Sequence, residues 1–221
     1  MGKEGKMEQN FIIRNEQLKD YREVEELTKK AFWNVHAPGC DEHYLVHVMR
    51  THEDFIPELD FVIEKDGVII GNIMYTKAWL TDRDGEEKEI LTFGPISILP
   101  EYQREGYGKA LLEFSFAKAK EMGYDAIVIF GHPHNYISRG FKSCKKYNVH
   151  LEGNIFPTAM LVLELEESVL SGKDWTYRES EAYCIKAEDA EEFDKQFPVM
   201  QKEYRLEHEE FYIYSHSRVI E

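Results

Sequence analysis

Two glycines, Gly106 and Gly108, stand in a short turn whose position suits the binding of a phosphate group. An apolar run, 91–99, comes before the turn and is typical of a buried strand, which Pro100 ends because proline cannot donate to a ladder. A helix is predicted over 109–122, where apolar residues recur on one face and Gly123 follows. The first N–H groups of a helix point outward with the positive end of the dipole behind them, and glycines allow close approach. The turn is therefore predicted to bind phosphate or pyrophosphate.

The spacing of this turn excludes two common phosphate motifs. A Walker loop requires a glycine where Gln103 stands and a serine or threonine where Ala110 stands. A dinucleotide fingerprint requires a third glycine where Leu111 stands, with an acidic partner at the end of a βαβ unit. Neither motif is present, so the sequence favours a phosphate ligand of another kind.

Further residues that could carry chemistry lie elsewhere in the chain. His43 and His47 are one helical turn apart, but Tyr44 stands where a zinc protease motif has glutamate. We predict no metal site and expect these histidines to be exposed to solvent, with a two-histidine transition-metal site as the alternative. The cysteines are odd in number and widely spaced, which favours buried or incidental thiols, and no Cys-His signature is expected around them. They are Cys40, Cys144 and Cys184.

The elements around the glycine turn alternate between strands and helices. Asp66-Gly67 is a strong hairpin signal, and Gly71 after it indicates a bulge. The predicted order is β-α-α-β-β-β-α-β-α-β. The strands are expected at 11–14, 61–64, 68–80, 86–99, 125–130 and 159–165, and the helices at 20–32, 41–50, 109–122 and 135–139, with a further amphipathic helix at 187–197.

Composition limits the classes of function. A chain of 221 residues with 43% hydrophobic residues can bury one core, so one domain is expected. The formal net charge of -15 argues against nucleic-acid binding and favours a cationic substrate. No apolar run reaches membrane-spanning length, and the start, 1–10, lacks the hydrophobic core of a signal peptide. We therefore expect no membrane partner and a cytoplasmic location.

The pattern Q-x-x-G-x-G after a strand ending I-x-I-x-P resembles the acetyl-CoA pyrophosphate loop of the GNAT superfamily of N-acetyltransferases. This resemblance covers roughly Phe11 to Tyr177, and the pieces GHP, Y-x-x-x-G-F and MLVLELEE resemble a bacterial subgroup of small predicted acetyltransferases. It implies an α/β (α+β) fold: a mixed, mostly antiparallel sheet of six to seven strands flanked by helices, with splayed fourth and fifth strands. The acetyltransferase domain is expected at 1–180. A C-terminal extension, 181–221, is expected to be partly helical and to pack on the core or on a partner.

The resemblance implies acetyl-CoA as cosubstrate. The pantetheine arm would lie beside the fourth strand, the pyrophosphate on the backbone of 104–109, and the N–H of Ile98 would face the thioester oxygen. For Asn135, capping of its own helix is the alternative to a pantetheine contact. The implied cofactor-binding residues are Ile96, Ser97, Ile98, Leu99, Gln103, Arg104, Glu105, Gly106, Tyr107, Gly108, Lys109 and Asn135.

Two residues are the implied catalytic candidates. Tyr136, in Y-x-x-x-G-F, matches the tyrosine that protonates the departing CoA thiolate in many superfamily members. A free tyrosine has a pKa of about 10 and a thiol about 8.5, so a hydrogen bond to the sulfur is one alternative and a packed core tyrosine another. The run 91–99 carries no carboxylate, so His132 is predicted as the general base, with a backbone-bonded loop histidine as the alternative. Glu89, Asp41, His43 and a water relay are further candidates for the base.

Taken together, these implications predict the transfer of an acetyl group to a primary amine of a small-molecule or peptidyl acceptor. The amine would attack directly in a ternary complex. The alternative is a non-catalytic acyl-CoA-binding sensor or interaction module with the same fold, which the missing strand carboxylate favours. A second enzymatic alternative uses a longer acyl chain or a hydroxyl acceptor. A homodimer is left open.

Overall fold

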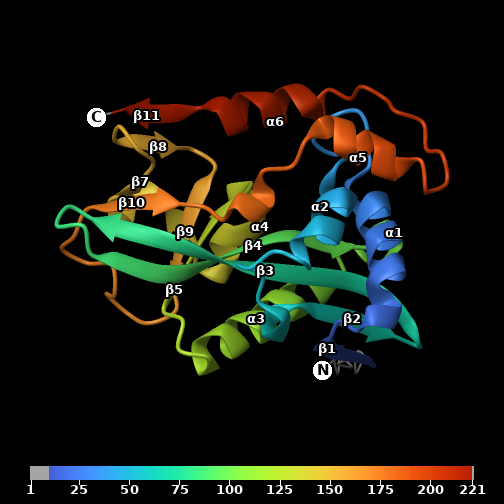
Figure 1. Cartoon of the computed structure of the whole chain (residues 1–221), viewed down its shortest axis with the longest axis horizontal. Coiled ribbons are helices and arrows are strands. Elements are labelled where there is room, and N and C mark those ends of the chain that lie inside the picture. The colour runs from blue at the N-terminus through green and yellow to red at the C-terminus, as the bar shows by residue number, and fades with distance from the viewer. Residues whose placement is uncertain (1–9, 221) are drawn as a thin grey trace, which may run out of the picture.

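A central β-sheet organises the molecule (Figure 1). The computed structural model describes residues 10–220, and in that part of the chain the sheet has nine strands. The main path runs β1-β2-β3-β4-β5-β9-β6, while β10 pairs with β3 and with β7. A separate pair joins β8 (Ile155–Pro157) to β11 (Arg218–Ile220). The strands of the large sheet are β1 (Phe11–Asn15), β2 (Phe61–Lys65), β3 (Val68–Asp82), β4 (Glu87–Ile98), β5 (Ala126–Phe130), β6 (Lys142–Ser143), β7 (Val149–His150), β9 (Met160–Glu164) and β10 (Trp175–Arg178).

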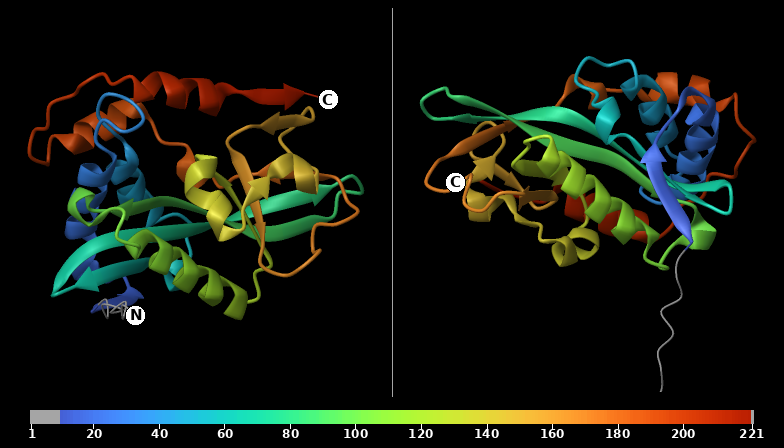
Figure 2. Two further views of the ribbon diagram at one scale, coloured as in Figure 1. Left: turned by 180° about the vertical axis from the view of Figure 1, so that it is seen from behind. Right: turned by 90° about the horizontal axis from the view of Figure 1, so that it is seen from below.

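Helices cover both faces of the sheet, as the views in Figure 2 show. On one face, the Ser97 Oγ of β4 donates to the Thr28 Oγ1 of α1 over 3.1 Å. On the other face, the Tyr75 hydroxyl of β3 lies 2.7 Å from the Ser115 Oγ of α3. A mixed sheet between helices is the α/β (α+β) arrangement that the sequence predicted. The helices are α1 (Tyr21–Phe32), α2 (Glu42–Met49), α3 (Tyr107–Glu121), α4 (Pro133–Tyr136), α5 (Ala187–Asp194) and α6 (Glu207–His216).

The strand count differs from the six to seven predicted. The strands β6 and β7 have two residues each, so they show no alternation of apolar and polar positions in the sequence. Without this pair, the described sheet has the seven strands of the prediction.

The hairpin between β2 and β3 forms at the predicted turn. Asp66 and Gly67 have φ values of +51° and +80°, the left-handed conformation that a two-residue turn of this kind requires at both positions. The register between β2 and β3 shifts after Ile63, which pairs with Gly71, so the predicted bulge is present. A side chain on Gly71 would place its Cβ 2.7 Å from the Ser97 carbonyl oxygen. The glycine therefore lets β3 lie close to the end of β4.

The fourth and fifth strands of the sheet separate. They run parallel and pair at one position, Leu91 with Ile127, and no described strand pairs with β4 on this side from Thr92 to Ile98. The splay implied by the resemblance is therefore present. It leaves an opening, called here the β4–β5 opening, along the last half of β4.

The C-terminal segment, from α5 through α6 to β11, lies along one side of the rest of the molecule (Figure 1). Trp33 donates its Nε1–H to the Gln201 carbonyl over 2.9 Å, and Lys29 donates its Nζ to the Pro198 carbonyl over 3.0 Å. Lys29 also forms an ion pair with Asp194 at 2.6 Å. The helix predicted at 187–197 is α5, which ends at Asp194. Residues 194–201 therefore pack on α1 and the loop after it, and β11 pairs with β8, while the domain boundary itself stays a prediction.

Two sequence expectations concern membranes and export. The first nine residues, where no signal peptide is predicted, lie outside the described part of the chain. Among residues 10–220, every helix is too short or too polar to cross a lipid bilayer.

Candidate active site

The predicted cofactor turn connects β4 to α3. Gln103 donates its Nε2–H to the Ile98 carbonyl over 3.0 Å, which holds the turn against the end of β4. Gly106 is the N-cap of α3 with φ of +95°, a conformation that a residue with a Cβ adopts only with strain. Arg104 also has a positive φ, +65°. The backbone conformation at position 106 therefore favours glycine over any residue with a side chain.

The start of α3 presents backbone donors. Its first hydrogen bond runs from the Ala110 N–H to the Gly106 carbonyl at 3.0 Å. The N–H groups of Tyr107, Gly108 and Lys109 come before that bond, and no described residue accepts from them. They lie at the positive end of a fifteen-residue helix. A helix start with free N–H groups is therefore present where the sequence predicted one, and the binding of an anion there stays a prediction.

The side chains of the predicted cofactor residues are not all available to a ligand. Tyr107 is buried, and its hydroxyl accepts a hydrogen bond from Lys65 Nζ at 2.6 Å. Ser97 is buried against α1, and Lys109 lies 3.7 Å from the Glu113 carboxylate. Ile96 and Ile98 are half-buried on β4, and Leu99 after them is buried. Ser97, Tyr107 and Leu99 could thus offer a cofactor only their backbone groups.

Tyr136 lies at the β4–β5 opening on the α3 side of the sheet. Its ring contacts those of Phe93 and Phe141, at centroid distances of 5.9 and 5.7 Å. Gly131 lies against the same ring, because a Cβ there would come within 2.6 Å of Tyr136 Cε2. Burial raises the pKa of Tyr136 to about 12, and no described residue bonds its hydroxyl. The ring is packed while the hydroxyl keeps its hydrogen-bonding capacity.

His132 and Asn135 lie at α4. The His132 side chain is the N-cap, since its Nδ1 accepts the His134 N–H at 3.3 Å. The ring is exposed and packs on Tyr214 at 5.1 Å, beside a groove of about 580 Å³ that α6 lines. Because His132 caps α4, Asn135 does not, so the capping alternative for Asn135 is excluded. The backbone-bonded reading of His132 fits these contacts, and its role as a base stays a prediction.

The further candidates for the base lie away from the opening or are engaged. Glu89 lies on β4 ahead of the pairing at Leu91, forms an ion pair with Lys77 at 3.2 Å and accepts from the Tyr124 hydroxyl. Asp41 is the N-cap residue of α2. Glu89 therefore lies outside the unpaired half of β4.

The expectation for His43 and Cys40 is wrong in two respects. His43 is fully buried rather than exposed, and its Nδ1 lies 3.5 Å from Cys40 Sγ. Its Nε2 lies 3.1 Å from Asp194, so a Cys-His-Asp row forms that the sequence did not predict. Burial raises the pKa of the Cys40 thiol and lowers that of His43, which keeps both groups neutral. The row therefore lacks the thiolate that a nucleophile requires.

A carboxylate that the sequence analysis did not consider lies at the opening. Glu179 directly follows β10 and points to the same face as Trp175 and Tyr177, which are buried. It is half-buried, and burial raises its pKa to about 7. The signal was present in the sequence, since the alternation W-T-Y-R-E places a glutamate where an apolar residue is expected.

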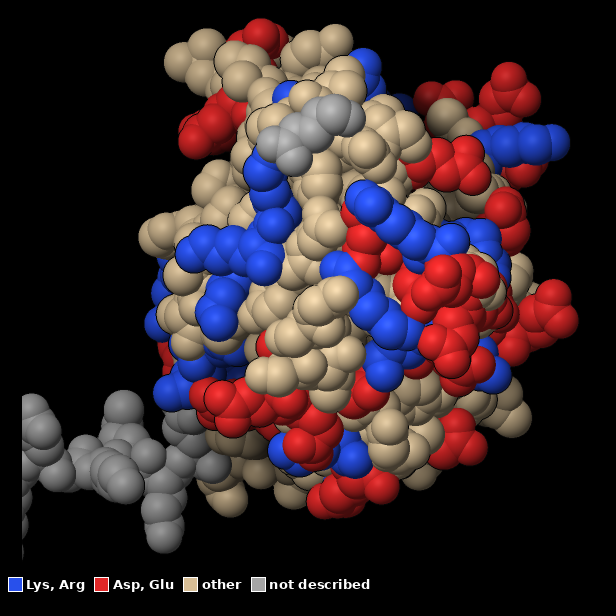
Figure 3. Space-filling model, turned by 90° about the vertical axis from the view of Figure 1, so that its left-hand side faces the viewer, with Lys and Arg blue, Asp and Glu red and all other residues tan. Residues whose placement is uncertain are grey.

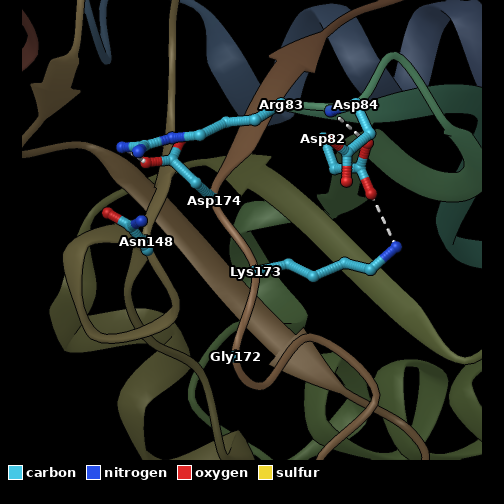
Figure 4. Close-up of a pocket in the computed structure, with 7 residues that line it drawn as sticks. All are labelled: Asp82, Arg83, Asp84, Asn148, Gly172, Lys173 and Asp174. Atoms are coloured by element: carbon cyan, nitrogen blue, oxygen red, sulfur yellow. Dashed lines mark hydrogen bonds and ion pairs between the residues drawn. The ribbon is translucent and has the colours of Figure 1, made fainter.

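A second polar region lies at the far tip of the β3–β4 hairpin, in a cavity of about 590 Å³ (Figure 4). Lys173 pairs with Asp82 at 2.6 Å and with Glu86 at 2.8 Å, and Arg83 pairs with Asp174 at 2.5 Å. Figure 3 faces this end of the molecule and shows acidic and basic side chains interspersed over it. Four of the five charged side chains that line this cavity are paired with one another, which indicates a structural role.

Comparison with known proteins identifies the family of this chain. The profile of the acetyltransferase (GNAT) family matches residues 21–143, more than half of the chain, so the chain belongs to that family. Over 126 residues it is 27% identical to the uncharacterized N-acetyltransferase YjhQ of Escherichia coli strain K12, a match that covers 57% of this chain and 66% of YjhQ.

Two solved structures share the fold. One is the GNAT family N-acetyltransferase YhbS from Escherichia coli in complex with CoA, at 23% identity and a TM-score of 0.68 over 79% of this chain and 92% of that one. The other is a GNAT family acetyltransferase from Brucella melitensis in complex with acetyl-CoA, at 24% identity and a TM-score of 0.62 over 79% and 99%. The predicted family and fold are confirmed.

Proposed function

We propose that the protein transfers an acetyl group from acetyl-CoA to a primary amine of a small-molecule or peptidyl acceptor. The observation that carries the proposal is the glycine N-cap of α3, whose free N–H groups follow directly on the unpaired end of β4. Family membership supports it, as do the CoA and acetyl-CoA bound by the two solved relatives. The net charge of -15 favours a cationic acceptor in a cytoplasmic setting.

In this proposal the backbone of 104–109 binds the pyrophosphate. The pantetheine arm lies along 96–99 in the place of a missing strand, and the Ile98 N–H stabilises the oxyanion that forms on the thioester. Lys109 and Arg139 both reach the Glu113 carboxylate, at 3.7 and 3.0 Å, which gathers two cations beside the turn. They would offset the repulsion between CoA phosphates and an acidic protein.

Tyr136 is proposed to hydrogen-bond the departing sulfur. Its pKa of about 12 lies above the thiol value of about 8.5, so full proton transfer to the thiolate would be uphill by roughly 5 kcal/mol. A hydroxyl that stays protonated is still a good donor to an anion. The CoA thiolate would then leave the acetyl carbonyl carbon while it accepts this hydrogen bond, and it would take its proton from solvent.

The test of the proposal is cofactor binding followed by turnover. Acetyl-CoA should raise the melting temperature, since a ligand that binds only the folded state at a hundred times its Kd stabilises that state by about 2.7 kcal/mol. Release of CoA thiol with a panel of primary amines should then follow. Unchanged melting at millimolar acetyl-CoA would contradict the proposal. Binding without any thiol release would favour the non-catalytic sensor.

Gly106→Val tests the turn itself. A β-branched residue at a φ of +95° distorts the turn and blocks the approach of a phosphate, so we expect acetyl-CoA affinity to fall by at least about a hundredfold. Gly123→Val is the matched control, because Gly123 has φ of +92° at the other end of α3 with open space around it. Calorimetric titration should show near-normal affinity in this control. Equal affinities in the two variants would refute the assignment of the turn.

A further inference from the structure

The backbone around Glu179 is fixed on both sides. Before it, β10 pairs with β3 up to Arg178, which lies opposite Trp79. After it, Ser180 donates its Oγ–H to Asp54 over 2.7 Å and accepts the Ala182 N–H at 3.1 Å. The position of the Glu179 side chain is therefore set by the sheet rather than by a free loop.

The surroundings of Glu179 place it at the β4–β5 opening. Tyr183 donates its hydroxyl to the Gly94 carbonyl over 3.2 Å, and Gly94 lies on the part of β4 that has left β5. The ring of Tyr177 packs on Phe130, the last residue of β5, at 6.1 Å. Burial raises the pKa of both tyrosines, and the negative charge of Glu179 raises both further. The carboxylate therefore faces two rings, one beside each of the separating strands.

Glu179 and Tyr136 lie on opposite sides of the same point of β4. Tyr136 contacts Phe93 from the α3 side, and Tyr183 contacts the next residue, Gly94, from the α2 side. Both tyrosines raise the pKa of Tyr75, after burial, so both lie near that one side chain. A thioester held in the opening would have Tyr136 on one side and Glu179 on the other.

The Glu179 carboxylate has no partner among residues 10–220. No described side chain or backbone group donates a hydrogen bond to it, and no described cation pairs with it. The neighbouring Arg178 points to the opposite face, where it pairs with Glu87 and lies over the Trp79 ring at 4.0 Å. The titratable groups that respond to its charge are Tyr177, Tyr183 and Cys184. All three groups are neutral when protonated and none of them carries a positive charge. A cationic ligand would therefore be the first positive charge to pair with the Glu179 carboxylate.

We propose that Glu179 forms the acceptor subsite, where it binds a primary alkylammonium between the rings of Tyr177 and Tyr183 and then serves as the general base. This inference rests on the proposed function. Aromatic faces and a carboxylate together suit an ammonium group, which the rings attract through their quadrupoles. Glu179 thereby takes the role that the sequence assigned to His132, whose Nδ1 is engaged in capping α4.

The proposed step conserves protons and electrons. Glu179 takes one proton from the ammonium and releases it to solvent, and the free amine attacks the thioester carbon. The N–C bond forms, the C–S bond breaks, and CoA leaves as a thiolate beside the Tyr136 hydroxyl. The acylated nitrogen loses its second proton, and the thiolate takes up one proton from solvent. A carboxylate with a pKa of about 7 is partly ionised at neutral pH, which suits an acid–base group.

The first test is kinetic, with n-butylamine and acetyl-CoA as probes. Glu179→Gln should lower kcat/KM by about 10²- to 10⁴-fold and remove the rise in kcat/KM between pH 6 and 8, while acetyl-CoA still raises the melting temperature. Glu181→Gln, an equal change of charge at an exposed position two residues away, should keep the wild-type profile. An unchanged kcat/KM and pH profile in Glu179→Gln would overturn the inference.

The second test needs neither turnover nor a variant. The carbon-13 shift of the Glu179 carboxyl should titrate near pH 7 in the unmodified protein, and n-butylamine should move that titration to lower pH, because a bound cation favours the carboxylate. A titration near 4, or one that does not respond to the amine, would overturn the inference. Since acetyl-CoA is absent, failure here is distinguishable from failure of cofactor binding.

Discussion

Two carboxylates flank the short strand β10 and contrast with one another. Asp174, just before the strand, is bonded by His150 Nε2 at 2.6 Å and paired with Arg83, and these contacts lower its pKa. Glu179, just after the strand, has no partner among the described residues, and burial raises its pKa to about 7. A strand of four residues thus separates a neutralised charge at the hairpin tip from an unneutralised one at the β4–β5 opening.

The contrast separates what stabilises the fold from what is available to a ligand. The pKa values of Asp174 and Asp82 are lowered by their partners, so their ionised forms favour the folded state. A half-buried carboxylate without a partner disfavours the folded state wherever it is ionised. Groups that cost stability in this way are typical of functional sites. The cavity at the tip of the β3–β4 hairpin is thus a poorer candidate for a ligand site than the β4–β5 opening.

Tyr136→Phe addresses the opening and should reduce turnover strongly. The variant removes the hydroxyl that has no described partner and keeps the packed ring, so we expect kcat to fall by about 10²-fold, the loss typical of one donor to a developing anion. Acetyl-CoA affinity and the melting temperature should change little. Steady-state kinetics with the amine panel measures the effect. Equal turnover would remove Tyr136 from the mechanism.

Asp174→Asn addresses the paired region. The buried His150 loses its acceptor carboxylate, so the free energy of unfolding at neutral pH should fall by about 1–3 kcal/mol. The ionised Asp174 favours folding above its unfolded pKa of about 3.9, and that contribution disappears as pH falls through the lower folded value. Urea unfolding should therefore show the largest difference near neutrality, with kcat/KM unchanged. A loss of activity without a loss of stability would mean that Asp174 serves catalysis rather than the stability of the fold.

Glu179→Gln should change stability less than Asp174→Asn does, and in the opposite direction. The folded pKa of about 7 lies above the unfolded value, so the folded state binds the proton more tightly and loses stability as pH rises from about 4.5 to 7. Removing the charge should stabilise the protein by about 1 kcal/mol at pH 8, a figure reduced because the side chain is half-buried. At pH 4 the two proteins should unfold alike. A destabilised variant at pH 8 would mean that Glu179 has a structural partner.

The sequence predicted the cofactor turn but not the acceptor side, and the reason is distance along the chain. Strand, proline, glycines and helix lie within 91–122, so local patterns were sufficient to predict a helix beside the glycine turn, although it was predicted from residue 109 and begins at Tyr107. Glu179 reaches the opening only because β10 pairs with β3, nearly a hundred residues earlier. Asp194 likewise meets His43 from the other end of the chain. The alternation W-T-Y-R-E indicates that Glu179 faces inward, but which distant strand or helix a side chain meets cannot be read from local patterns in a single sequence.

Part of the contact between the C-terminal segment and α1 with the loop after it runs through the main chain of that segment. Arg22, Lys29 and Trp33 donate to the carbonyl oxygens of three different tail residues, and the Asn34 amide shares one of them. Carbonyl oxygens are identical in every amino acid, so side-chain substitutions at those three tail positions leave these hydrogen bonds available. The path of this part of the tail therefore depends on Arg22, Lys29 and Trp33 more than on the identity of the residues whose carbonyls they bond.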